Sequence, residues 1–189
     1  MNRTTLGTAI ALLTIVTTRL PTSAWLSAQS RETFSATATA GNTAESAVPI
    51  TITFTIDRYT TEAEHMSLRS ALNQGPSALQ AALKAMPDIG VITVGDRRTA
   101  LKYAYKPPQN GGQTITLLTA EPLAYLDPGP KDKPKEGYGL ALAKLDFSPP
   151  GFAVGELDPA VKVTINSAGM IETQEYGAAI VRLTNVERK

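Results

Sequence analysis

Hydrophobic and polar residues alternate over much of the chain, as they do in strands that bury one face. The clearest run is 50–56, where every second residue is Ile or Phe and the residues between them are Thr. Alternation with a period of two and many β-branched residues predicts a strand with one face on the core and the other in water. Comparable runs occur at 31–40, 89–94, 101–106, 114–119, 139–147, 161–165, 171–176 and 180–186, and 123–126 is a candidate edge strand.

Between residues 61 and 86 the hydrophobic period changes to that of a helix. Leu68 and Leu72 lie at helical spacing, and Leu79, Leu83 and Met86 form a second apolar stripe. An Asn-Gln-Gly-Pro sequence divides the two stripes, and proline favours the first turn of a helix. We therefore expect a helical hairpin of two short helices.

Short turns join most consecutive strands, which favours antiparallel pairing. The sequence therefore predicts an α+β fold: a mostly antiparallel, curved sheet or β-barrel of about nine strands, with one helical hairpin at about residues 61–86. Alternation alone leaves open whether the sheet closes into a barrel or folds as a sandwich.

The first 28 residues have the composition of a secretory signal. Arg3 precedes an apolar stretch at 6–16, and Pro21 is followed by small residues suited to cleavage. The apolar stretch is too short to cross a bilayer comfortably, and an uncleaved membrane anchor is the alternative. We expect a secreted or periplasmic bacterial protein. Its mature part, residues 29–189, is expected to be a single β-rich domain with no further membrane span.

Charge and composition narrow the chemistry. The chain has 18 Lys and Arg, 17 Asp and Glu, one His and no Cys. Removing Arg3 and Arg19 with the signal leaves 16 basic residues and a net charge of −1, which does not favour a nucleic acid as a partner. Without cysteine, a thiol nucleophile and a Cys/His zinc site are impossible, and no nucleotide-binding glycine pattern occurs. We expect neither a metal nor a cofactor.

The single histidine, His65, lies close to acidic residues at the start of the expected hairpin. Glu62 and His65 have the Glu-x-x-His spacing of di-iron bundles, but those sites need a second such motif. A structural interpretation accounts for the same residues, with Thr61 as the helix N-cap and Glu64 as its capping-box partner. We therefore expect His65 on the helix surface, with Arg69 as its solvent-side neighbour.

Tyr103 and Tyr105 are the candidate ligand-binding residues. They lie two residues apart in an expected strand and should share one face with Leu101. Tyrosines in this position are either core residues whose hydroxyls reach the rim or part of the lining of a ligand cavity.

Three short motifs carry a resemblance: Ile56-Asp57-x-Tyr59, Thr119-Ala-Glu-Pro122, and a closing Tyr176-Gly177 followed by Val181-Arg-Leu-Thr-Asn-Val186. Together they resemble an uncharacterised group of secreted bacterial proteins, found mostly in soil bacteria. The resemblance extends over most of the mature chain and implies export and a single domain. It implies no activity, cofactor or catalytic residue.

Three classes of function remain open. The first is an exported, non-enzymatic binding module for a small apolar ligand or for a protein or envelope partner. The second is a structural or assembly role at the cell envelope, through pairing of an edge strand. The third is a hydrolase that uses carboxylates such as Asp57, Glu62 or Glu172. An internal cavity lined by Tyr103 and Tyr105 would favour the first, and two converging carboxylates would favour the third.

Overall fold

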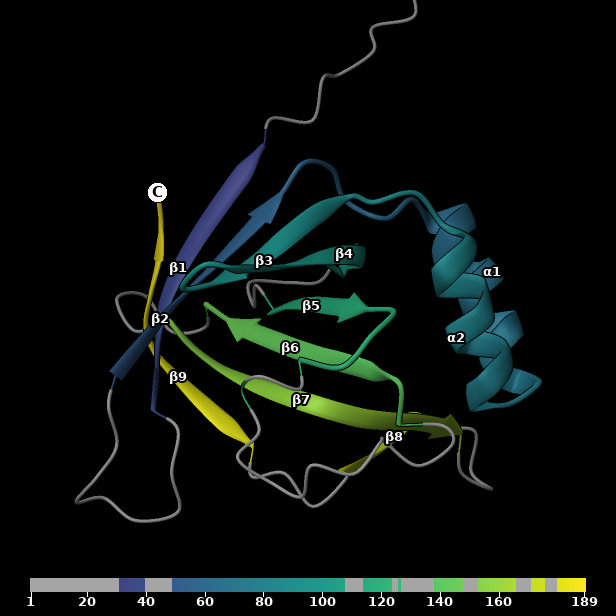
Figure 1. The fold of residues 1–189 in the computed structure, drawn as a ribbon. Coiled ribbons are helices and arrows are strands. Elements are labelled where there is room, and N and C mark those ends of the chain that lie inside the picture. Colours follow the sequence, from purple (N-terminus) through teal and green to yellow (C-terminus); the bar gives the residue numbers. More distant parts are fainter. Residues whose placement is uncertain are drawn as a thin grey trace, which may run out of the picture.

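The computed structural model describes residues 31–39, 49–107, 114–123, 126, 138–147, 153–165, 171–175 and 180–189. These residues form nine strands and two helices (Figure 1). The strands are β1 (Glu32–Thr39), β2 (Pro49–Ile56), β3 (Gly90–Val94), β4 (Arg97–Tyr105), β5 (Thr114–Thr119), β6 (Leu140–Asp146), β7 (Val154–Ile165), β8 (Ile171–Glu175) and β9 (Val181–Arg188). The helices are α1 (Glu62–Asn73) and α2 (Pro76–Ala85).

Eight of the strands close into an antiparallel barrel. Hydrogen-bonded neighbours follow the order β6-β5-β4-β3-β2-β1-β9-β7, and β6 pairs with β7 to complete the ring. From β1 to β7 each strand pairs with the next one along the chain, as short connections favour. The pairing of β6 with β7 decides between a barrel and a sandwich, and the expected α+β fold with a helical hairpin is confirmed.

The two halves of β7 have different neighbours. Residues 155–157 pair with β9 within the ring, whereas residues 161–165 pair with β8. Opposite Leu140–Leu142 the register shifts, because β7 has one residue more than β6 around Pro159. Such a bulge bends the strand that carries it. The second half of β7 therefore extends past the ring, and β8 is added to it as a ninth strand.

The barrel interior is packed with apolar side chains from every strand of the ring. The buried cluster includes Phe34, Ile52, Ile92, Leu101, Leu117, Leu145, Leu157 and Leu183. Gly155 allows a close approach of β7 to β6, since a β-carbon there would be 2.8 Å from the carbonyl oxygen of Lys144. This packing gives the barrel its own core, independent of the helices.

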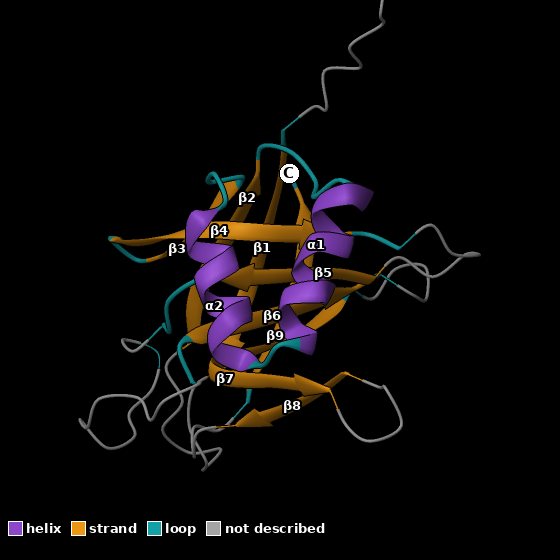
Figure 2. Ribbon diagram, turned by 90° about the vertical axis from the view of Figure 1, so that its right-hand side faces the viewer, coloured by secondary structure: helices purple, strands orange, loops and turns teal. Residues whose placement is uncertain are grey.

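A second apolar layer lies between the hairpin and the outside of the barrel. Figure 2 shows α1 and α2 lying side by side across the strands β4, β5 and β6. The helices bury Leu68, Leu72, Leu79 and Leu83, which contact Tyr103, Leu118, Leu140, Val161 and Val163. The hairpin is therefore held to the barrel by burial of one apolar stripe from each helix.

The structure differs from the sequence prediction in three strands. β4 begins at Arg97 and not at the expected Leu101, since Arg97 and Arg98 already pair with β3. Of the expected edge strand 123–126, residues 124 and 125 lie outside the described residues. Leu123 and Leu126 belong to no strand and are buried in the barrel core, so their apolar character reflects burial. β7 begins at Val154 and not at the expected Val161, because Pro159 interrupts the alternation at the bulge without ending the strand.

The expected signal at residues 1–28 lies outside the described residues. In the part of the chain that is described, no helix has both the length and the apolar character needed to cross a membrane.

Candidate functional site

The connection from β2 to α1 fixes the start of the hairpin against the barrel. Past the first residue of β3, the segment after β2 lies beside β4 in its place: the backbone amide of Thr60 donates to the carbonyl oxygen of Ala104 at 2.7 Å. In return, the amide of Ala104 donates to the Thr60 hydroxyl at 3.0 Å. Thr60 is buried, so both bonds are shielded from water. They place the first turn of α1 beside the end of β4.

The first turn of α1 is capped as the sequence predicts. The Thr61 hydroxyl accepts from the backbone amide of Glu64, and the Glu64 carboxylate accepts from the amide of Thr61. Arg58 adds two hydrogen bonds to the same carboxylate, at 2.8 and 2.9 Å. Together with the capping bonds, the Arg58 guanidinium lowers the pKa of Glu64 to about 2. These residues stabilise the start of α1. The turn that follows, which contains His65, faces β4.

Tyr103 and Tyr105 both face outward, toward the hairpin. Leu101 pairs with Thr119 and Tyr103 with Leu118, so β4 has one extra residue, Lys102. This bulge turns the following residues to the other face. The expectation that both tyrosines share a face with Leu101 is therefore wrong, since Leu101 points into the barrel core and Tyr103 packs in the outer layer.

His65 joins α1 to these two tyrosines. Its Nδ1 lies 2.9 Å from the Tyr103 hydroxyl, and its ring is stacked on Tyr105 with 4.3 Å between centroids and 7° between planes. The Tyr105 hydroxyl in turn donates to the Glu62 carboxylate at 3.2 Å. The expectation that His65 lies on the helix surface is wrong. The bulge in β4 presents a tyrosine pair to the helix, and the ring is half-buried against it.

Both phenols are protonated at neutral pH. Burial is the main cause of the raised pKa of Tyr103, and the charge of Glu62 adds to it. Desolvation and the hydrogen bond to Glu62 raise the pKa of Tyr105 as well. The two hydroxyls are therefore suited to hydrogen bonding and not to nucleophilic attack.

A pocket of about 110 Å³ opens beside His65, between the hairpin and the barrel. Most of its lining is aliphatic: Leu68, Leu72, Leu79, Leu118, Leu142 and Val163. Its polar side chains are His65, Tyr103, Thr116 and Arg69. The pocket is therefore a small apolar hollow with a few polar groups around it, which is the usual composition of a small-molecule site. Tyr103 lines this pocket, whereas Tyr105 supports it from behind His65.

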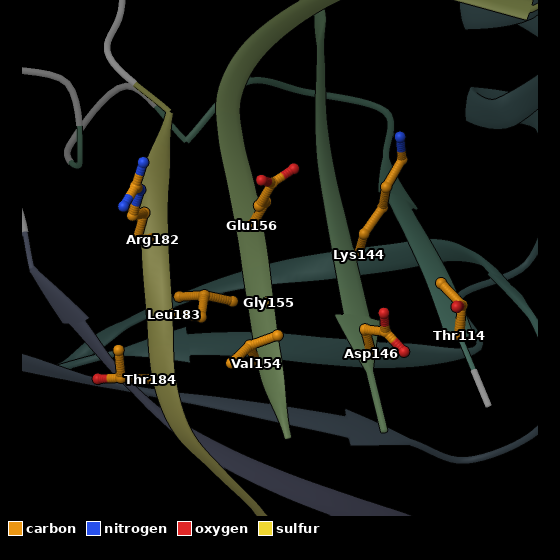
Figure 3. A pocket seen from close by; sticks show the side chains of 9 residues that line it. All are labelled: Thr114, Lys144, Asp146, Val154, Gly155, Glu156, Arg182, Leu183 and Thr184. Carbon is orange, nitrogen blue, oxygen red and sulfur yellow. The ribbon is translucent and has the colours of Figure 1, made fainter. Parts of the chain in front are cut away.

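A second, larger hollow of about 530 Å³ lies over β5, β6, β7 and β9 (Figure 3). Lys144, Glu156 and Arg182 form a row across it, because they are directly opposite one another in the β6–β7 and β7–β9 pairings. Val154 lies beside this row with about half of its surface exposed. The charges of the row alternate in sign, so the hollow has no dominant charge that would select an ionic ligand.

The carboxylates considered for a hydrolase have separate partners. Asp57 pairs with Arg31 at 2.6 Å, and Glu62 accepts from Tyr105. Glu172 is exposed on β8, opposite Thr164. Across the described residues, no cluster of three or more His, Asp or Glu side chains is arranged to hold a metal ion.

Comparison of the chain with protein-family models, curated proteins and solved structures found no match. The resemblance to secreted bacterial proteins stays a prediction. The function has to be inferred from the pocket itself.

Proposed function

We propose that this chain is an exported, non-enzymatic binding module that takes a small apolar group into the pocket beneath its helical hairpin. Export, to the periplasm or the medium, rests on the signal pattern of residues 1–28. The observation that carries the binding function is the pocket between the helices and the barrel, with its aliphatic lining and its His65–Tyr103 corner. The described part of the barrel core is packed and both tyrosines lie outside it, so an internal cavity lined by Tyr103 and Tyr105 does not support this proposal, and the outer pocket does.

The volume of the pocket limits the ligand. An engineered cavity of about 150 Å³ lined by Leu, Ile and Phe binds benzene. At about 110 Å³ this pocket is somewhat smaller and open to solvent on one side, so it suits a branched aliphatic group of about four or five carbons. Groups of that size bind weakly, with a Kd of about 1–10 mM.

The test is a titration of the full chain, with methyl NMR, using 3-methylbutan-1-ol as a neutral aliphatic probe. We expect saturable shifts confined to the methyl groups of Leu68, Leu118 and Val163. Leu142→Phe, which fills the pocket from its partly exposed rim, should abolish them. The matched control is Val154→Phe, which adds the same ring to the other hollow and should leave the titration unchanged. Shifts that never saturate, or that survive Leu142→Phe in a folded protein, would refute the function.

An assembly role at the envelope is the second candidate, and one observation favours it. β8 ends the strand order and pairs only with β7 among the described strands, so its other edge offers backbone hydrogen-bonding groups. A strand of five residues is a short edge for stable pairing. Thr173→Pro in β8 should convert oligomers to monomers in light scattering if this edge assembles the protein, and should change nothing if it does not.

A further inference from the structure

The pocket has one arginine in its lining, and this side chain has no ion-pair or hydrogen-bond partner among the described residues. Arg69 lies one helical turn after His65 on α1, and both residues line the pocket. Nothing else in the described part of the chain forms an ion pair or a hydrogen bond with Arg69. Arg69 is also exposed, so its guanidinium is accessible to a ligand.

The acidic residues nearest to Arg69 on α1 are already engaged. Glu62 accepts from Tyr105, and Glu64 is held by Arg58 and Thr61. Both lie in the first turn of the helix, whereas Arg69 lies two turns further on, beside Leu68 and Leu72. A free guanidinium thus adjoins an aliphatic hollow. A guanidinium is planar and permanently charged, and its parallel N–H groups match the two oxygens of a carboxylate.

We propose that the ligand of this pocket is a carboxylate attached to a short branched aliphatic chain, with the chain in the hollow and the carboxylate on Arg69. This inference rests on the proposed binding function and names its ligand class. The carboxylate lies toward Arg69 because Arg69 is the arginine of the lining, and no carboxylate side chain lines the pocket among the described residues. The hollow accepts the aliphatic part, since its lining is aliphatic and its volume suits about four or five carbons.

Two kinds of molecule carry a carboxylate on a short branched chain: a free short-chain carboxylate, and the C-terminus of a peptide that ends in an aliphatic residue. Both present a carboxylate beside a branched chain, and they differ in the amide group on the α-carbon. The opening of the pocket to solvent leaves room for that amide outside the hollow.

The test compares three probes on the full chain by methyl NMR: 3-methylbutanoate, 3-methylbutan-1-ol and N-acetyl-valine, which is 3-methylbutanoate with an acetamido group on its α-carbon. The first two have the same carbon skeleton, so their difference reports the charge. We expect 3-methylbutanoate to bind about threefold to tenfold more tightly than the alcohol at low salt, with the advantage decreasing as salt is added. If N-acetyl-valine binds more tightly than 3-methylbutanoate, a peptide C-terminus is the source, and the reverse order indicates a free carboxylate.

Arg69→Gln should remove the advantage of the carboxylates over the alcohol, so that the ratio of the two affinities falls to about one. Arg69→Lys should retain part of it, and Arg98→Gln, which removes an exposed guanidinium on β4, should have no effect. Equal affinities for acid and alcohol in the wild type, unchanged by Arg69→Gln, would overturn this inference and leave the binding function intact. Saturable binding of none of the probes would overturn both.

Discussion

The imidazole of His65 and the ring of Tyr105 are stacked in nearly parallel planes, 7° apart. One ring belongs to the hairpin and the other to the barrel, and the hydrogen-bond contact of His65 with Tyr103 links the same two elements. The contact is therefore both a wall of the pocket and a connection between the two apolar layers. Its removal should affect stability as well as binding.

We expect His65→Ala to lower the free energy of unfolding by about 1–2 kcal/mol. It removes a ring stack and leaves the buried Tyr103 hydroxyl without its partner. His65→Phe keeps the stack and should lose about 1 kcal/mol. Urea unfolding measures both. Met66→Ala, at an exposed position of the same helix, is the control and should change stability by less than about 0.5 kcal/mol. A His65→Ala effect as small as that of the control would contradict the structural link.

Part of this site could have been found in the sequence. His65, Leu68, Arg69 and Leu72 are spaced at i, i+3, i+4 and i+7, so the histidine continues the apolar stripe that was identified from the leucines. That spacing already places His65 and Arg69 beside the buried face. The capping residues Thr61 and Glu64 account for the charges around His65, so the local sequence alone favours a solvent-exposed histidine.

The orientation of Tyr103, the closure of the barrel and the pocket depend on contacts between distant segments, which no single stretch of the sequence indicates. The strands follow from alternation, but the extra residue at Lys102 that turns Tyr103 outward is a property of the pairing between β4 and β5. The closure of the ring also needs β1 to pair with β9, the first and the last strand along the chain, so residues far apart in the sequence decide it. The pocket exists only once the hairpin lies on this face, so no segment of the sequence could specify it.

Protonation of Glu64 should weaken the protein in acid. Its pKa is about 2 in the folded state and 4.5 ordinarily, so its stabilisation is complete above about pH 4.5 and is lost as the pH falls toward 2. We expect Glu64→Gln to cost about 1 kcal/mol at pH 7, since the ion pair with Arg58 is partly exposed. The difference from wild type should disappear near pH 2. Urea unfolding at both pH values measures this, and Glu187→Gln, which removes an exposed carboxylate of β9, should show no such convergence.

Gly90 should tolerate no side chain. A β-carbon there would lie 2.2 Å from the carbonyl oxygen of Thr55, across the β2–β3 pairing. Backbone atoms cannot move aside without separating the strands, so Gly90→Ala should lower the free energy of unfolding by about 2–3 kcal/mol. Gly95→Ala has open space but a positive φ of 56°, and we expect a smaller loss of about 1 kcal/mol. Thermal and urea unfolding compare the two, and equal losses would show that strain and not contact limits both positions.

Lys102, the extra residue of β4, should stabilise the fold mainly through the backbone of the hairpin. Its ammonium donates to the carbonyl oxygen of Met86 at 2.8 Å, which ties the end of α2 to the barrel, and it pairs with Asp88 at 2.6 Å. The Asp88 side chain is 65% exposed and the Lys102 side chain 17%, so water screens the ion pair more than the bond to the carbonyl. We expect Lys102→Met to cost about 1–2 kcal/mol and Asp88→Asn less than about 0.5 kcal/mol in urea unfolding. Lys106→Met, at an exposed position just after β4, controls for loss of a positive charge. If Asp88→Asn costs as much as Lys102→Met, the ion pair and not the bond to Met86 holds the hairpin at this point, because only the ion pair is lost in both variants.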